Sequence, residues 1–374
     1  MKISILSVAP PYRGGISEQT SYLYNALKES HEVKIINFTK QYPDFLFPGK
    51  SQFDTNLNVG SLENNLRVIN SINPFSWLKA IKCILAQSPD LVILRFWNPF
   101  FAICHGFIIK RLKKIAPNIK VIAICDNIIP HERHLIDIYL IKFLFSSIDA
   151  FIVMSEQVES ELLSLFPDAE YDKLFHPIVS REANYSKIES REMLNIFNKN
   201  IILFYGFIRD YKGLDVLIRS NEYLFDKLDD YKIIICGEPY GNDNKYRKLI
   251  SKYNFNNEIL WVDKYISDEL TEKYFTASDI VVLPYKSASQ SGVIPLSYSY
   301  ETPVIASNIS GIREMIVNRK TGLVFEKNNY IDLSDKIISF FESDVDYKAH
   351  INDFRNDFSW NNFVKQIIKL HNMI

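Results

Sequence analysis

The sequence is short of cysteine, and the cysteines it has are scattered. Only 4 of the 374 residues are cysteine, at positions Cys83, Cys104, Cys125 and Cys236, without a CxxC pair or a cluster with histidine. This pattern lacks the spacing of metal ligands. It predicts buried, reduced thiols in a cytoplasmic protein.

Net charge is also scarce. The 43 Lys and Arg residues nearly balance the 44 Asp and Glu residues. Nothing in this balance indicates a nucleic-acid partner or a polyacidic partner, so any recognition of charge must be local. With 47% hydrophobic residues, the chain is unlike disordered or fibrous proteins, and its length predicts about two domains.

Long apolar runs are missing as well. The most apolar stretch, residues 91–109, is interrupted by Arg95, Pro99 and His105, which makes it a poor membrane span. The first strand-like run, Ile3–Val8, begins directly after two residues, with no charged region, apolar core and cleavage site before it. We therefore expect neither a transmembrane helix nor a secretory signal.

Short runs rich in Ile and Val alternate with segments of helical period, as expected of parallel sheets with crossover helices. The predicted strands are 3–8, 32–36, 90–96, 120–125 and 150–154, then 201–205, 232–236, 259–262, 279–283 and 303–306. The predicted helices are 17–28, 99–115 and 156–166, then 214–228, 245–253, 267–275, 293–300 and 333–341. The near-continuous apolar strands predict burial on both faces of each sheet.

The pattern lapses between about His176 and Lys199 into a polar stretch with a short helical piece at 192–196. We place the domain boundary there, with an N-terminal domain of residues 1–178 and a C-terminal domain from residue 179. The expected fold class is α/β, with two Rossmann-like domains facing across a cleft that holds the site. The long segment 40–63 is either a cover for this cleft or a packed surface excursion.

A glycine-containing loop follows the first strand of each predicted domain. Gly14 and Gly15 precede a helix, where backbone N–H groups and the helix dipole favour an anion. The segment lacks GxGxxG and GxxxxGK[ST], so nicotinamide binding or ATP hydrolysis has no motif support, and a plain turn is the alternative. In the second domain, Gly206 is followed by Arg209 and Lys212, which suit a diphosphate unless the loop is merely a solvated basic one.

A third candidate loop begins after the strand at 279–283. Ser291 and Gly292 lead through Val293 into a helix, and a serine cap beside glycine leaves first-turn amides open to an anion. The alternative is an ordinary capped helix. If both loops of the C-terminal domain bind an anion, their two helix starts converge on the same phosphates.

Six ordered blocks of the C-terminal half resemble the nucleotide-sugar half of family-4 glycosyltransferases with the GT-B fold. They are residues 203–218, 262–268, 277–285, 290–293, 303–306, and 311–314 with 321–323. The first half is similar through residues 14–15, 95–99, 126–132 and 153–155, so the resemblance spans nearly the whole chain.

This resemblance implies a metal-independent transfer that retains anomeric configuration and needs no cofactor besides the nucleotide-sugar donor. Arg209, Lys212 and the amides of residues 291–293 would stabilise the departing diphosphate. Glu314 occupies the position of an acidic residue near the donor, where it would contact a hydroxyl of the ribose or sugar, or else cap a helix. The last segment, residues 357–374, resembles the helix that crosses back onto the first domain, which ends the second domain at residue 356.

Several positions depart from the family pattern. The paired glutamates are replaced near Ala288 and Leu296, as in a Gln-Ser-Gly-Val subgroup, and Phe207 stands where an arginine is common. A sugar-contacting histidine at the end of the fourth strand is replaced by Asp126, and His131 follows five residues later. Asp126 and His131 are expected either to contact sugar hydroxyls or act as a base, or to line the cleft structurally.

The helix at 99–115 carries aromatic residues and ends in Lys110, Arg111, Lys113 and Lys114. Basic charge beside aromatics would suit a membrane surface that bears a lipid-linked acceptor. The same charges also complement the helix dipole without any partner.

The sequence therefore predicts a cytoplasmic, bacterial-type glycosyltransferase of the hexosyltransferase kind, acting on a saccharide or lipid-linked acceptor in surface polysaccharide synthesis. A sugar-nucleotide epimerase of the same architecture is one rival, although carboxylates are sparse near the Ser-Gly-Val loop. A catalytically silent nucleotide-sugar-binding subunit is a second rival, and a dehydrogenase is a third.

Overall fold

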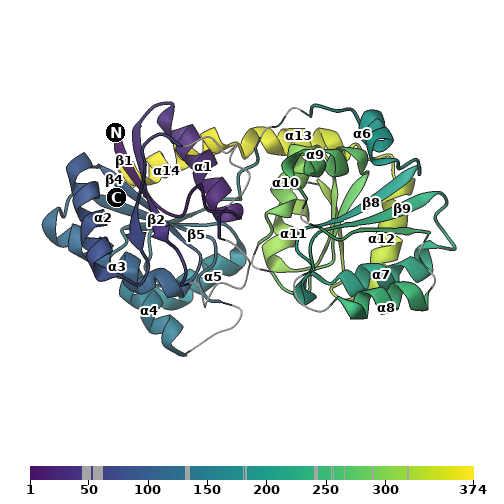
Figure 1. The fold of residues 1–374 in the computed structure, drawn as a ribbon, viewed down its shortest axis with the longest axis horizontal. Coiled ribbons are helices and arrows are strands. Elements are labelled where there is room, and N and C mark those ends of the chain that lie inside the picture. Colours follow the sequence, from purple (N-terminus) through teal and green to yellow (C-terminus); the bar gives the residue numbers. More distant parts are fainter. Residues whose placement is uncertain are drawn as a thin grey trace. The chain divides into compact units, whose positions relative to one another are not determined.

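The chain folds into two compact units (Figure 1). The computed structural model describes residues 1–43, 52–53, 62–130, 135–179, 181, 183–239, 243–253, 255, 257–264, 266–288, 290–317 and 320–374. Unit 1 comprises Met1–Phe175 with Trp360–Ile374, and unit 2 comprises His176–Ser359. The boundaries predicted after residues 178 and 356 fall close to these limits.

Unit 1 is built on a parallel sheet with the strand order β3-β2-β1-β4-β5-β6-β7. Its strands are β1 (Lys2–Leu6), β2 (Glu32–Lys40), β3 (Asn65–Asn70), β4 (Leu91–Phe96), β5 (Lys120–Cys125), β6 (Ala150–Val153) and β7 (Tyr171–Lys173). Its helices are α1 (Gly15–Lys28), α2 (Pro74–Gln87), η2 (Pro99–Phe101), α3 (Ala102–Ile115), α4 (Leu135–Phe145), α5 (Glu156–Leu165) and α14 (Trp360–Met373). The central strands β4, β5 and β6 are almost wholly buried, as expected of a sheet covered on both faces.

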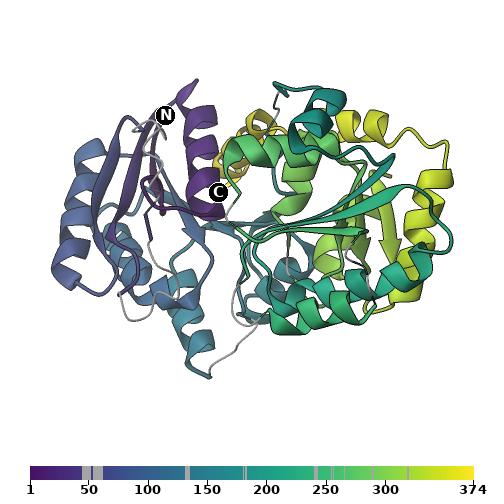
Figure 2. The same cartoon turned by 45° about the vertical axis from the view of Figure 1, so that its right-hand side comes forward.

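Unit 2 has a second parallel sheet with the order β10-β9-β8-β11-β12-β13 (Figure 2). Its strands are β8 (Asn200–Tyr205), β9 (Tyr231–Cys236), β10 (Ile259–Val262), β11 (Ile280–Leu283), β12 (Val304–Ser307) and β13 (Gly322–Phe325). Its helices are α6 (Lys187–Leu194), η3 (Asp210–Lys212), α7 (Leu214–Leu224), α8 (Asn244–Lys252), α9 (Asp268–Ala277), α10 (Val293–Ser299), α11 (Ser310–Val317), α12 (Tyr330–Glu342) and α13 (Tyr347–Asp357).

Local sequence explains where several helices begin. Asn73 accepts a hydrogen bond from the amide of Phe75 and Pro74 occupies the first helical position, so α2 starts there. Ser186 and Glu189 form a capping box at the start of α6. The helix predicted at 192–196 therefore begins earlier in the sequence than expected, because its capping residue, Ser186, lies more than one turn before residue 192.

Each sheet has one point at which the strand order reverses. In unit 1 this switch point lies between β1 and β4, and in unit 2 it lies between β8 and β11. Loops leave the carboxyl ends of the two strands in opposite directions at such a point, which opens a crevice that ligands use in folds of this kind. The loops after β1, β4, β8 and β11 are therefore where a functional site is expected.

The last helix returns to unit 1. The chain leaves unit 2 beside its point of entry, where Ile178 and Ser359 form an isolated bridge. Helix α14 then packs against α1, with the rings of Tyr22 and Trp360 6.0 Å apart. Lys120 Nζ donates a 2.6 Å hydrogen bond to the main-chain oxygen of Ile374.

The predicted strands are all present, most within one or two residues of their expected limits, but several elements were not predicted. These are β3, β7, β13, α2, α4, α11 and α13. Most of the predicted long segment 40–63 lies outside the described residues. Within the described part of the chain, none of the helices has the length and apolar character that crossing a membrane requires.

Candidate functional site

The site in unit 2 starts at the carboxyl end of β8, where Gly206 follows Tyr205. Gly206 has a φ of +100°, a conformation that residues with a side chain rarely adopt. A Cβ at this position would lie 2.7 Å from Lys212 Nζ. Glycine therefore lets the strand end in this conformation and leaves room for the ammonium group.

Lys212 is a buried cation. The residue is 8% exposed, and its Nζ lies 5.6 Å from the centroid of the Tyr285 ring. Among the described residues, no carboxylate forms an ion pair or hydrogen bond with Nζ. Burial lowers the pKa of Lys212, and the charge of Arg209 lowers it further, whereas Tyr211 opposes the shift. An anion bound beside Nζ would offset the cost of burying this charge.

The loop after β11 packs directly on the loop after β8. Gly213 has a φ of +67°, and a Cβ there would come within 1.9 Å of the carbonyl oxygen of Pro284. The amide of Lys286 donates to the carbonyl oxygen of Tyr211 at 2.6 Å. The two loops at the switch point thus form one packed structure, and Lys212 lies within it.

The same loop continues into α10. Burial raises the pKa of Tyr285 to about 12, against a smaller lowering by its hydrogen bond with Ser291, whose Oγ lies 3.5 Å from the phenol oxygen. Ser291 Oγ also accepts from the amide of Val293 at 3.3 Å. The sequence led us to expect Ser291 as the helix cap, but the cap is Gly292. The serine hydroxyl binds the first-turn amide of Val293 from the position before the cap. No described residue lies within 4 Å of the place that a Cβ on Gly292 would occupy.

Arg209 and Glu314 differ in environment. Arg209 is exposed and occupies the cap of the short helix η3, two residues after Phe207. Glu314 lies within α11 and is buried, at 5% exposure. The next residue after Arg209, Asp210, forms an ion pair with Lys245 of α8.

The site in unit 1 lies at the switch point between β1 and β4. Gly14 caps α1 with a φ of +111°, Gly15 begins the helix, and a Cβ on either would meet nothing within 4 Å. Within the described part of the chain, no side chain forms a capping hydrogen bond at this helix start. One turn on, Gln19 Oε1 accepts a hydrogen bond from Nη2 of Arg95, which comes from the end of β4.

Arg95 joins this helix start to Asp126 at the end of β5. Its Nε and Nη2 donate to the two carboxylate oxygens of Asp126 at 2.7 and 2.6 Å, and both side chains are buried. The bidentate pair fixes the geometry of the carboxylate and compensates its charge. Asp126 is therefore held in a buried ion pair, and His131 lies outside the described residues.

The sequence pointed to Gly14, Gly15, Gly206, Arg209, Lys212, Ser291, Gly292, Val293 and Glu314, and the structure brings all of these except Glu314 into three groups. Gly206, Arg209 and Lys212 lie together, Ser291–Val293 adjoin them through Tyr285, and Gly14–Gly15 lie in unit 1. Sequence reasoning missed Gln19 and gave Arg95 no role. An arginine inside the otherwise apolar run of β4 was the available signal, because a buried guanidinium needs a counter-charge.

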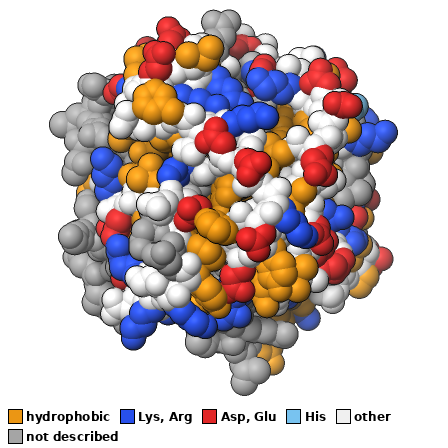
Figure 3. Space-filling view, turned by 90° about the vertical axis from the view of Figure 1, so that its right-hand side faces the viewer, with side chains coloured by type: hydrophobic (Ala, Val, Ile, Leu, Met, Phe, Trp, Pro, Cys, Tyr) orange, Lys and Arg blue, Asp and Glu red, His pale blue; other side chains and the backbone are white. Residues whose placement is uncertain are grey.

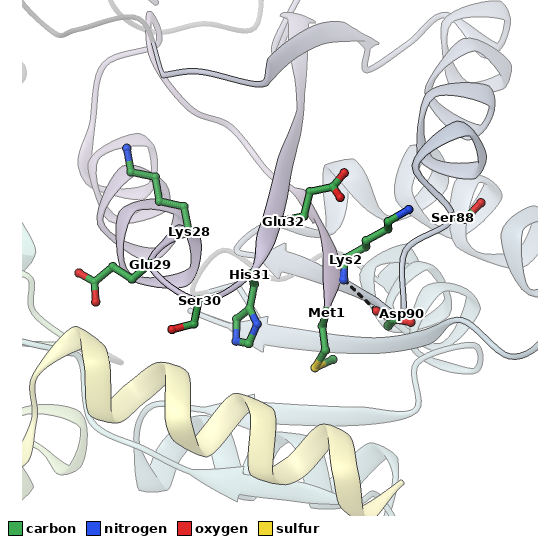
Figure 4. Close-up of a pocket in the computed structure, with 9 residues that line it drawn as sticks. All are labelled: Met1, Lys2, Lys28, Glu29, Ser30, His31, Glu32, Ser88 and Asp90. Carbon is green, nitrogen blue, oxygen red and sulfur yellow. Dashed lines mark hydrogen bonds between the residues drawn. The ribbon is translucent and has the colours of Figure 1, made fainter.

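Two other features give no support to a metal or ligand site. No three His, Cys, Asp or Glu side chains lie together as potential metal ligands in the described ranges. An open depression lies at the amino-terminal edge of the unit 1 sheet, lined among others by Lys2, His31 and Asp90 (Figure 4). The amide of Lys2 donates to Asp90 at 2.8 Å there. This edge lies opposite the carboxyl ends of the strands, where the candidate residues are.

Comparisons with known proteins agree with this geometry. Residues 186–359 match the family model described as Glycosyl transferases group 1. The chain is 24% identical over 379 residues to an uncharacterized glycosyltransferase of Methanocaldococcus jannaschii, an alignment that covers 99% of this chain and 98% of the other.

Two further relatives extend the comparison. The chain is 27% identical over 192 residues to the D-inositol 3-phosphate glycosyltransferase of Corynebacterium glutamicum, which covers 49% of this chain and 46% of that protein. The match thus spans about half the length of that curated relative. The structure of HepE from Anabaena, solved in complex with UDP-glucose, superposes with a TM-score of 0.75 at 14% identity and covers 100% of both chains. The chain therefore has the GT-B fold, its residues 186–359 match the group 1 glycosyltransferase model, and its sequence is similar to a glycosyltransferase over nearly its whole length.

Proposed function

We propose that this protein transfers a sugar from a nucleotide-diphosphate donor to a saccharide or lipid-linked saccharide acceptor. The bond between the anomeric carbon and the diphosphate oxygen breaks, a bond from the anomeric carbon to an acceptor oxygen forms, and the acceptor hydroxyl loses its proton. The nucleoside diphosphate leaves with the bonding electrons. Negative charge therefore accumulates on the diphosphate as the reaction proceeds.

The single observation that carries this proposal is the buried ammonium of Lys212 at the switch point of unit 2, with which no carboxylate of the described residues pairs. A cation that is already desolvated and held by its surroundings stabilises developing anionic charge without reorganisation. Donors of this kind are typically worth about 3–4 kcal/mol each in the transition state. Arg209 is assigned the second cationic contact. The backbone amide of Gly292, at the start of α10, is assigned a further hydrogen bond to the diphosphate.

The relatives suggest where to look for the donor and the acceptor. HepE was solved with UDP-glucose, so UDP-sugars are the first donors to test. The name of the Corynebacterium relative adds D-inositol 3-phosphate to the acceptors worth testing. Glu314 is assigned a hydroxyl of the donor ribose or sugar, and Gly14 and Gly15 are assigned the donor side of unit 1.

The finer points of the proposal follow from the family resemblance. They are retention of anomeric configuration, independence of metal and resident cofactor, a cytoplasmic location with peripheral membrane contact, and a role in bacterial surface polysaccharide synthesis. Retention is tested by the anomeric proton coupling of the product in NMR. Metal independence is tested by full activity of the purified chain in excess EDTA.

The central test is a thermal-shift panel of nucleoside diphosphates and their sugars on the full chain, because a ligand of the native state raises the melting temperature. We expect a shift with one diphosphate series, and its loss in Lys212→Ala and Arg209→Ala. Lys227→Ala is the matched control, since Lys227 is an exposed lysine of the same unit. The absence of a shift with any diphosphate, or an equal shift in Lys212→Ala, contradicts the proposal.

A catalytically silent donor-binding subunit is the second candidate, and the ion pair between Asp126 and Arg95 is the observation that favours it. Because that carboxylate is already paired, it is poorly suited to take a proton from an acceptor. Slow hydrolysis of the donor in the absence of acceptor distinguishes an active transferase from a silent binder. Conversion of the donor to its epimer, followed by NMR, would instead identify an epimerase.

A further inference from the structure

Three neighbouring helices of unit 1 carry a surface whose charge differs from that of the chain as a whole. Helix α3 packs against both α2 and α4, so the three form one layer (Figure 1). Together they contain seven basic residues: Lys79, Lys82, Lys110, Arg111, Lys113, Lys114 and Lys142. Their single acidic residue, Asp137, is buried. The whole chain, by contrast, has a net charge of −1, so basic charge is concentrated here.

The same layer exposes large apolar side chains. Phe75 and Leu78 of α2, Ile103 and Phe107 of α3, and Ile136, Tyr139 and Phe143 of α4 are exposed, with exposed fractions from 36% to 83%. In each helix they recur at the spacing of one helical face, so they are not scattered singly. Lys113 forms an ion pair with Asp149, so its charge is compensated. We call this surface, with the other six basic residues named above, the α2–α4 face.

Contacts between the helices make the α2–α4 face continuous. The rings of Trp77 and Phe107 lie 5.6 Å apart and connect α2 to α3. Lys110 Nζ lies 4.1 Å from the ring centroid of Phe143 and connects α3 to α4. At Gly106 the two helices approach so closely that a Cβ would lie 2.5 Å from the Phe143 ring. Apolar and basic side chains thus share one surface.

We propose that the α2–α4 face binds the surface of an anionic lipid bilayer. Aromatic and aliphatic side chains beside lysines are the composition of helices that lie in the headgroup region, where apolar groups enter the interface and cations attract anionic lipid. Tyr139 is 74% exposed and Phe75 is 83% exposed, and amphipathic aromatic rings favour that depth.

Charge and composition favour a bilayer over a protein. A second copy of this chain would bring two faces of the same charge together in a symmetric dimer, which is unfavourable. Six of the seven basic residues are lysines, a residue type depleted from protein interfaces, where arginine is enriched. Elsewhere charge is mixed: on the side of unit 2 drawn in Figure 3, acidic and basic side chains are interspersed.

The direction of the helices connects the face to the candidate site of unit 1. Helices α2, α3 and α4 follow strands β3, β4 and β5, so their first turns lie toward the carboxyl edge of the sheet. Phe75, Ile103 and Ile136 lie in those first turns. A bilayer on this face would thus lie beside the edge that holds Arg95 and Asp126. The inference rests on the proposed function in one point, the peripheral membrane contact, and deepens it by naming the surface that makes this contact.

Vesicle sedimentation with the full chain tests this inference. We expect binding to vesicles of phosphatidylcholine with phosphatidylglycerol, weak binding to phosphatidylcholine alone, and a loss of binding as salt is raised. Arg111→Glu with Lys114→Glu should lower the partition coefficient about tenfold or more, from the usual contribution of each basic residue near a charged surface. Ile136→Ser with Tyr139→Ser should lower it on both vesicle types.

The matched control is Lys248→Glu with Lys252→Glu on α8 of unit 2, which changes the net charge equally at another surface and should leave binding unchanged. Equal partition onto both vesicle types overturns the inference, as does a control that loses as much binding as the variant. A dimer in sedimentation velocity that Tyr139→Ser dissociates would also overturn it and assign the face to self-association. The donor-induced melting shift is the readout for the proposed function, and these variants should leave it unchanged.

Discussion

The ammonium of Lys212 lies against the α-carbon of Gly206, where an added Cβ would stand 2.7 Å from Nζ. Gly206 also has a φ of +100°, which only glycine adopts readily. Glycine at the end of β8 therefore meets two requirements. It adopts the positive φ, and it leaves the space that the ammonium group occupies. Any side chain there must displace the cation or the backbone.

Gly206→Ala should weaken binding of the nucleoside diphosphate at least tenfold and lower the free energy of unfolding by about 1–3 kcal/mol, the usual cost of a strained backbone position. Calorimetry with UDP and urea unfolding measure the two effects. Lys227→Ala is the control, since Lys227 is an exposed residue of the same unit outside the site. In a Lys212→Met background, Gly206→Ala should weaken binding little further, because both changes act on one ammonium group. Unchanged affinity in the single variant would contradict this account.

Lys212→Met should raise the melting temperature of the free protein while abolishing its shift with the diphosphate. The lowered pKa of Lys212 means that the native state binds this proton more weakly than the unfolded chain does. The charged lysine therefore destabilises the fold at neutral pH, and the penalty is relieved as the pH rises from the lowered pKa toward the ordinary value of 10.5. The stability difference between Lys212→Met and the parent should shrink over that interval. A variant that melts lower than the parent at neutral pH would show that the lysine is paired.

Much of the fold is predictable because buried parallel strands leave an unmistakable pattern. Strand β5 was predicted with its exact limits, Lys120–Cys125, and β10 with its limits at Ile259–Val262. Strand β3 was missed because it lies at the sheet edge, where only Ile69 is fully buried and the apolar run disappears. Helix α2 was missed although Asn73 and Pro74 are a good start signal.

The site was predictable in its residues but not in its contacts. Glycines and cations after strand ends pointed to Gly206 and Lys212, since that chemistry is local. The approach of Gly213 to Pro284 and the pairing of Arg95 with Asp126 depend on which strands are neighbours in the sheet. Strand order is a property of the tertiary fold, so local sequence patterns do not predict these contacts.

Gly213 and Gly292 form a matched pair for testing how the two loops of unit 2 pack. Gly213→Ala should lower the free energy of unfolding by about 2–4 kcal/mol, because it combines a φ of +67° with a Cβ 1.9 Å from the oxygen of Pro284. Gly292→Ala should change it by less than about 0.5 kcal/mol, since its φ is −66° and nothing lies within 4 Å. Urea unfolding of both variants measures the difference. Equal costs would mean that the loops are not packed as described.

The ion pair between Arg95 and Asp126 should be costly to break from either side. Arg95→Met leaves a buried carboxylate without its partner, and Asp126→Asn leaves a buried guanidinium, so each should lower the free energy of unfolding by about 3–5 kcal/mol. Arg95→Met combined with Asp126→Leu should cost much less than the sum, because no charge remains buried.

Asp126→Asn also separates a structural carboxylate from a catalytic base. If the carboxylate only holds Arg95, the rate of donor turnover per folded molecule should fall less than tenfold, because the amide oxygen still accepts one of the two hydrogen bonds from Arg95. A base that takes a proton in the transition state contributes about 10²–10⁴-fold, so its loss would be far larger. The measurement is turnover at saturating donor, with the folded fraction taken from the unfolding curve. A hundredfold loss with donor affinity unchanged would assign the chemistry to Asp126 after all and make Arg95 the group that positions it.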